Sequence, residues 1–276
     1  MNTEMLSYIK KDSPIHKLTG ATKLICFLLW TIAAMITYDT RVLLGLFLLG
    51  IVAFKVSKIE FKEISFVLYF ILFFLFLNTI MIFVFSPLEG VNIYGTRHDI
   101  IHLVGPYVLT KEQLFYELNV ILKYFATIPM ALLFILTTEP SEFAASLNKL
   151  GINYKAAYTV SIALRYIPDV QRDYKDISFA QQARGIDLSK NEKILKRIKN
   201  SSAILMPLIF SSLERIDKIS LAMELRAFGN NKKRTWYTRR KFEKQDYISI
   251  LIMIIIALIS IFMVKINGSR FFNPFI

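Results

Sequence analysis

Apolar segments with few charged residues recur along the chain at lengths suited to a lipid bilayer. Five such segments occupy residues 22–38, 42–56, 64–85, 114–138 and 247–264. A bilayer core of about 30 Å takes about 20 helical residues, so the third and fourth segments span it comfortably and the fifth just does, while the first two are short. The pattern predicts an all-α integral membrane protein with about five transmembrane helices.

The first two apolar segments are separated only by residues 38–41, which read Tyr-Asp-Thr-Arg. We interpret these residues as a tight turn between two helices slightly shorter than the membrane, with Lys23 and Lys55 extending their charged groups to the headgroups. The alternative is one long helix through both segments. It would place Asp39 and Arg41 near the bilayer midplane, at a cost of roughly 2.5 to 3.5 kcal/mol each.

Basic residues are distributed unevenly between the predicted loops. With the N-terminus in the cytoplasm, the inner segments carry 28 of the 34 lysines and arginines. Cytoplasmic loops are enriched in these residues, so the count predicts an N-terminus inside and a C-terminus outside. The chain then divides into transmembrane helices 1–4 in residues 1–138, a cytoplasmic module in 139–245, and a last transmembrane helix with a short outer tail in 246–276.

Composition and charge favour lipid as the surrounding medium. Hydrophobic residues make up 54% of the chain and aromatic residues 14%, which exceeds the need of a soluble core. The net charge of +13 does not indicate nucleic acid, because the 21 basic residues between 139 and 247 are interspersed with 12 acidic ones. The basic run at 232–234 lies just before the last apolar segment, where anionic headgroups are the nearer partner.

The cytoplasmic module is predicted to contain one short and two long helices. Proline at position 140 and glycine at 151 delimit a helix over 139–150, and two further helices are expected over 154–184 and from about 191 to about 228. Gly185 and Gly229 follow the two long helices in positions that favour a left-handed C-terminal cap.

Both long helices carry an apolar stripe with residues spaced by three or four. The stripe contains Val160, Leu164, Ile167, Val170, Tyr174, Ile177 and Ala180 on one helix and Leu205, Ile209, Leu213, Ile216, Ile219 and Met223 on the other. We expect this stripe, with Leu164, Ile167, Leu213 and Ile216 at its centre, to form an interface with a partner protein rather than a soluble core.

Each long helix also contains an internal proline, Pro168 in the first and Pro207 in the second. Proline removes one backbone hydrogen bond and clashes with the preceding turn, so a bend is expected at each site. The alternative is that the prolines divide shorter helices.

The two long helices end in the same nine-residue signature. Residues 177–185 and 219–227 share the order Ile-Ser-apolar-Ala-x-x-apolar-Arg-small, at a constant offset of 42 residues. An arginine in the last helical turn can complement the helix dipole, a stabilisation of about 0.3 to 1 kcal/mol. Two arginines in the same context, Arg184 and Arg226, favour a second hypothesis, in which they form two equivalent docking points. A guanidinium group suits this role because it stays charged and offers paired donors.

These motifs resemble the transmembrane T component of energy-coupling factor transporters, the prokaryotic importers of vitamins and metal ions of the ATP-binding cassette type. The resemblance covers most of the chain and rests on residues 13–18, 137–140, 147–152 and 163–168 together with the two arginine signatures. One departure is visible, since Thr19-Gly20-Ala21 stands where such proteins commonly carry Asp-Pro-Arg ahead of a lysine, here Lys23.

The resemblance implies the following role for the chain. A T component holds a membrane-embedded, substrate-binding S component and contacts two ATPases through crossed, kinked coupling helices. The residues implied in ATPase coupling are Ala183, Arg184, Gly185, Leu225, Arg226 and Ala227. The resemblance also implies a multi-pass protein of the prokaryotic cell membrane that has no catalytic residue or cofactor of its own, since ATP and Mg²⁺ would be bound by the partner ATPases.

Two other functions are considered. An integral membrane metalloenzyme would use His98 and His102 of the outer loop, yet no further His or Cys completes a ligand set, so no metal site is predicted. A self-sufficient secondary transporter would need an ion-coupling residue in the bilayer, for which Asn78 and Lys123 are the candidates; Lys123 is expected to snorkel. None of the ten glycines is followed by lysine, so no phosphate-binding P-loop is present and ATP must be hydrolysed by a partner.

Overall fold

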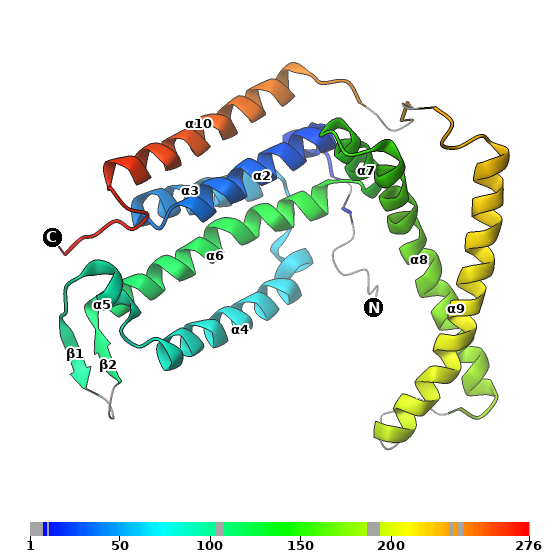
Figure 1. Ribbon diagram of the computed structural model, residues 1–276, viewed down its shortest axis with the longest axis horizontal. Helices are drawn as coiled ribbons and strands as arrows, with labels where there is room; N and C mark the ends of the chain where they lie inside the picture. Colours follow the sequence, from blue (N-terminus) through cyan, green and yellow to red (C-terminus); the bar gives the residue numbers. More distant parts are fainter. Residues whose placement is uncertain are drawn as a thin grey trace. The chain divides into compact units, whose positions relative to one another are not determined.

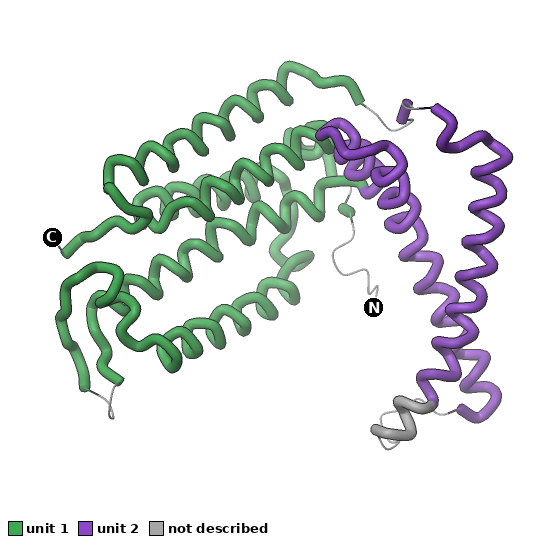
Figure 2. The backbone as a smooth tube through the Cα atoms, in the orientation of Figure 1, with its two compact units in different colours: residues 1–139, 240–276 green, residues 140–239 purple. Residues whose placement is uncertain are grey.

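The computed structural model describes residues 8–9, 11–102, 107–186, 194–231, 235–236 and 240–275. The chain forms two compact units, which Figure 2 shows in different colours. Unit 1 comprises Met1–Glu139 and Arg240–Ile276, and unit 2 comprises Pro140–Arg239.

Unit 1 is a bundle of long apolar helices with one small hairpin (Figure 1). Its elements are α1 (Pro14–Lys17), α2 (Gly20–Ile36), α3 (Thr40–Val56), α4 (Phe61–Phe85), α5 (Glu89–Tyr94), β1 (Asp99–His102), β2 (Val108–Thr110), α6 (Lys111–Thr137) and α10 (Lys244–Ile266). Helix α6 packs against both α2 and α3, and α10 packs against α2. The strands pair antiparallel, with Ile101 opposite Leu109 and His102 opposite Val108. The hairpin was not foreseen.

The core of unit 1 lies where α2, α3 and α6 meet. Trp30 is only 2% exposed, and its indole Nε1 donates to the backbone carbonyl of Ala126 on α6 at 2.9 Å. Ala34, Leu46 and Leu133 belong to the same cluster of buried residues. A buried indole needs a hydrogen-bond partner, so this contact fixes α2 against α6 as well as filling space.

Three helices in the described part of the chain are long and apolar enough to cross a membrane, namely α4, α6 and α10. The predicted pair of short helices is also present, because α2 ends at Ile36 and α3 begins at Thr40, each helix being 17 residues long. The single long helix considered as the alternative is therefore wrong. Asp39 explains the break, since its carboxylate accepts from the Arg41 amide and caps the start of α3.

The expectation that Lys23 and Lys123 extend their charged groups toward the headgroups is wrong. Lys23 is 6% exposed and Lys123 is 9% exposed. Each ammonium group instead donates to a backbone carbonyl at the C-terminal end of a neighbouring helix, Thr137 at 2.6 Å for Lys23 and Met35 at 3.2 Å for Lys123. The last carbonyls of a helix have no partner within it, which makes them good acceptors for a buried cation.

Unit 2 contains α7 (Pro140–Lys149), α8 (Tyr154–Ala183) and α9 (Ile194–Leu225). Helix α7 packs on α8, and α8 packs on α9. Pro168 and Pro207 lie inside continuous helices, so the alternative in which they divide shorter helices is wrong. The second long helix, α9, was predicted to start near residue 191, which lies outside the described residues. Its end comes at Leu225 rather than near Phe228, because Ala227 takes a left-handed backbone conformation with φ of +51°.

Candidate functional site

The two arginine signatures end their helices with the same backbone hydrogen bonds. After α8, the amides of Gly185 and Ile186 donate to the carbonyls of Gln182 and Gln181 at 2.9 and 3.0 Å. This pair of bonds is a Schellman motif, in which the residue after the cap is left-handed, and Gly185 has φ of +84°. Arg184 is the C-cap residue of α8.

The end of α9 repeats this arrangement 42 residues later. The amides of Ala227 and Phe228 donate to the carbonyls of Glu224 and Met223 at 2.8 and 2.9 Å, so Arg226 occupies the position equivalent to Arg184. An alanine in the left-handed region costs roughly 1 to 2 kcal/mol, and this cost is accepted here to form the same cap. The nine-residue repeat in the sequence is therefore matched by a repeat of the backbone hydrogen bonds.

All six residues that the sequence analysis assigned to coupling lie on the surface of unit 2. The exposed set comprises Ala183, Arg184, Gly185, Leu225, Arg226 and Ala227. Leu225 is 81% exposed, an unusual environment for a leucine, and Phe179 in the last turns of α8 is 67% exposed. Each helix end thus presents an arginine beside apolar surface, which is the composition of a protein contact.

Helices α8 and α9 form an antiparallel hairpin within unit 2 (Figure 1). Within this hairpin, Arg215 of α9 pairs with Asp173 of α8 at 2.5 Å, and these two residues are also 42 positions apart. Arg184 and Arg226 lie equally far beyond this ion pair along their helices, in opposite directions. Each lies 11 residues from the ion pair. With a rise of about 1.5 Å per residue this is about 16.5 Å, so the two arginines are roughly 33 Å apart along the hairpin.

A second contact holds the hairpin together at a proline. Pro207 has no amide hydrogen, which leaves the carbonyl of Ala203 without its usual helical donor. The side-chain amide of Gln181 on α8 donates to that carbonyl at 3.1 Å. Sequence reasoning missed this bond, although a carbonyl four residues before an internal proline is a general signal that a donor is needed nearby.

The apolar stripe of the two long helices does not close a core inside unit 2. Ile167, Leu213 and Ile216 are 51%, 50% and 57% exposed, and Leu164 is half-buried. The hairpin also has a polar hollow of about 460 Å³, lined by Tyr166, Asp169, Arg172, Asp173, Asp176 and Arg215. Unit 2 therefore offers both an uncovered apolar surface and a charged one.

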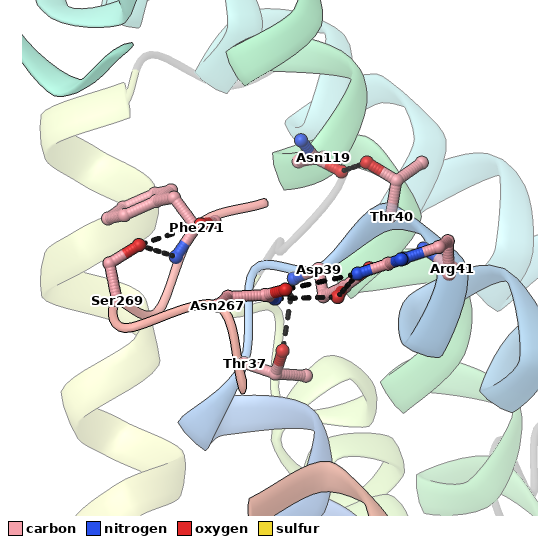
Figure 3. A network of polar contacts seen from close by, with 8 residues as sticks. All are labelled: Thr37, Asp39, Thr40, Arg41, Asn119, Asn267, Ser269 and Phe271. Atoms are coloured by element: carbon pink, nitrogen blue, oxygen red, sulfur yellow. Dashed lines mark hydrogen bonds and ion pairs between the residues drawn. The ribbon is translucent and has the colours of Figure 1, made fainter. Parts of the chain in front are cut away.

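In unit 1, a polar network joins the turn before α3 to the end of α10 (Figure 3). The carboxylate of Asp39 is fully buried and accepts from Arg41 Nη2 at 2.7 Å and from Asn267 Nδ2 at 2.8 Å. Burial alone would raise the pKa of Asp39, but these hydrogen bonds and the one from the Arg41 amide hold that pKa below its ordinary value. The side chain of Thr40 donates to Asn119 of α6 at 2.6 Å. The network fastens helices together and holds no arrangement for catalysis.

Three of the residues considered for the two other functions, His98, His102 and Lys123, make polar contacts within unit 1. His98 Nδ1 lies 2.6 Å from the buried carboxylate of Glu112, and His102 lies 3.5 Å from Asp99. Among the described residues, no group of three or more His, Cys, Asp or Glu side chains is placed to hold a metal ion. Lys123 caps α2 and lies 3.6 Å from the ring centre of Tyr38, so its charge is already satisfied.

Comparison with known proteins adds independent evidence. The family described as "Cobalt transport protein" (CbiQ) matches residues 11–237. The "Energy-coupling factor transporter transmembrane protein EcfT" of Streptococcus thermophilus is 30% identical to this chain, over 91% of this chain and 95% of its own. Proteins of the same name from Lactococcus lactis and Bacillus subtilis are 28% and 27% identical, over 96% and 93% of this chain and 99% and 96% of theirs.

Proposed function

This chain belongs to the CbiQ family and is a transmembrane T component of an energy-coupling factor transporter, and we propose that it couples two ATPase subunits to a substrate-binding S component. In this role it transmits ATP-driven motion to the S component for the uptake of vitamins or metal ions. The relatives are named as transmembrane components of a transporter, which supports a non-catalytic subunit. ATP and Mg²⁺ would be held by the ATPases.

The observation that carries this proposal is the pair of equivalent arginine caps. Arg184 and Arg226 end antiparallel helices with the same Schellman hydrogen bonds and lie on the surface beside apolar side chains. Two equivalent ends suit two equivalent partners, because one kind of groove can then receive both. In each groove the guanidinium would clamp a carboxylate or a carbonyl edge with paired donors.

The uncovered apolar stripe supports the second half of the proposal. Leu164, Ile167, Leu213 and Ile216 would contact the S component or another membrane partner, because surface of this kind is normally covered. The prolines inside α8 and α9 weaken each helix at one point, which suits helices that must change shape while they stay packed.

The proposed topology follows from the same division of the chain. Residues 1–138 and 246–276 would lie in the membrane and residues 139–245 in the cytoplasm, with the N-terminus inside a prokaryotic cell membrane. The boundaries of unit 2 at Pro140 and Arg239 are compatible with this division. The apolar helices α4, α6 and α10 support a membrane location.

Purification of the assembled complex tests the proposal. The tagged chain is expressed with the ATPases and membrane proteins of its own host, and subunit ratios are measured by quantitative mass spectrometry. We expect two ATPase subunits and one small membrane protein per chain, with ATP hydrolysis in the same fraction. Leu213→Glu should deplete the membrane protein, whereas Lys175→Glu, an exposed position on α8, should not. A chain that purifies without ATPases and still transports would contradict the proposal.

A further inference from the structure

The first turn of α2 holds the end of α6 through a buried lysine. Lys23 Nζ lies 2.6 Å from the carbonyl of Thr137 and 3.4 Å from that of His16. Thr137 is the last residue of α6, and its carbonyl is one of those that find no partner within the helix. The ammonium group therefore satisfies this carbonyl and complements the negative end of the helix dipole.

The residues just before Lys23 contact the chain again where it returns from unit 2. The guanidinium of Arg240, the first residue of unit 1 after unit 2, donates to the carbonyls of Lys17 and Leu18 at 3.3 and 3.4 Å. Asp246, which is 2% exposed in the first turn of α10, accepts from the Thr19 amide at 2.9 Å. This bond fixes the start of α10 to the start of α2.

Segment 16–23 thus contacts unit 1 on both sides of the point where unit 2 is inserted. The chain passes from unit 1 to unit 2 between residues 139 and 140 and returns between 239 and 240. Any force on unit 2 that travels along the chain reaches the membrane helices through these two crossings. Segment 16–23 contacts unit 1 beside both crossings, at Thr137 before the first and at Arg240 after the second.

We infer that Lys23 is a positioning residue for coupling, and that segment 16–23 is the anchor against which unit 2 is moved. This inference rests on the proposed function. If the end of α6 could fray or slide, a movement of unit 2 would displace only that end and would not move the other helices of unit 1. The bond from Lys23 to Thr137 removes that freedom, because a buried charge-assisted hydrogen bond resists both changes.

The chain provides a matched control in Lys123. Helices α2 and α6 each carry a buried lysine that caps the other helix, Lys23 at the end of α6 and Lys123 at the end of α2. Lys23→Met and Lys123→Met therefore remove the same kind of interaction from the same helix pair. Only Lys23 lies at the end of α6 that leads into unit 2.

The test uses the complete complex with its ATPases and the membrane partner, reconstituted in nanodiscs. Spin labels are attached at Lys62→Cys in unit 1 and Lys175→Cys in unit 2, both exposed, with Cys26→Ser as background. The distance between the labels is measured without nucleotide and with Mg-ADP-vanadate, and ATP hydrolysis is measured on the same samples. These measurements need no knowledge of the transported substrate.

We expect the unsubstituted complex and Lys123→Met to show the same nucleotide-dependent shift in the label distance. Lys23→Met should keep ATP hydrolysis but lose the shift. If it fails to assemble, Lys23→Gln, which keeps a donor but loses the charge, is measured in its place with the same expectation. An unchanged shift in the Lys23 variant, or an equal loss in the Lys123 variant, would overturn the inference. A missing shift in the unsubstituted complex would instead count against the proposed function.

Discussion

Removal of the Asp39 carboxylate should strongly destabilise the bundle, because this group serves two helices at once (Figure 3). It caps the start of α3, an interaction of about 1 kcal/mol, and accepts from the Asn267 amide at 2.8 Å, where a hydrogen bond to a charged group contributes about 1.5 to 3 kcal/mol. The ion pair with Arg41 adds little to stability, since that guanidinium is half exposed. Asp39→Ala should therefore lower the free energy of unfolding by about 2.5 to 4 kcal/mol.

Unfolding by sodium dodecyl sulfate in mixed micelles, followed by the fluorescence of buried Trp30, measures this loss. Asp99→Ala is the control, because Asp99 is also paired with an arginine two residues away, Arg97, but is partly exposed and caps no helix. Asp99→Ala should unfold much like the unsubstituted protein, because an exposed ion pair contributes little to stability. Asn267→Ala in the Asp39→Ala background should cost little more than Asp39→Ala alone. The reasoning is refuted if the Asp39 and Asp99 variants unfold alike, or if the Asp39 and Asn267 effects add in full.

Three further predictions concern the rest of the chain. Gln181→Ala removes the donor to the Ala203 carbonyl and should speed amide exchange in α9 around Pro207 about fivefold. Pro207→Ala restores the helical donor and should suppress that effect. Hydrogen–deuterium exchange measures both. Burial lowers the pKa of His16 below its ordinary 6.5, so the unfolded chain takes up a proton more readily than the folded protein. The protein should therefore lose stability as pH falls below about 6.5. This loss should be smaller in His16→Gln when unfolding is compared at pH 7.5 and 5.5. Cysteines at Thr96 and Asn230, in a Cys26→Ser background, should react with impermeant reagents from opposite sides of the membrane, and labelling from the same side would contradict the topology.

The helices and their ends were largely predictable because the signals are local. Apolar spacing and glycine caps defined α8, and a proline in the first turn marked α7. The end of α9 was misplaced because the residue that takes the left-handed conformation is Ala227, and alanine gives no such signal in a sequence. Hydrogen-bond geometry decided that end, and the geometry depends on the whole turn.

Contacts between distant residues were not predictable in the same way. In the sequence, Lys23 stands near the start of the first apolar segment and Lys123 stands inside the fourth. Exposure of the charged group is the usual outcome for lysine. Their partners, Thr137 and Met35, are backbone carbonyls more than 80 positions away, and a backbone group carries no mark in the sequence. The bond between Asp39 and Asn267 spans 228 positions and became visible only once the helices were packed.

The most direct test of the account is the number of ATPase subunits that purify with the chain when both cap arginines are replaced. At an interface, truncating one partner of a buried charge pair costs roughly 2 to 5 kcal/mol, so Arg184→Ala with Arg226→Ala should release the ATPases. Replacement by glutamate should be worse, because it adds repulsion. Lys175→Ala with Lys218→Ala, exposed positions on the same two helices, should retain both subunits. Helix-capping arginines without a docking role would contribute at most about 1 kcal/mol of stability each, so a double arginine variant that keeps both ATPase subunits would contradict the account.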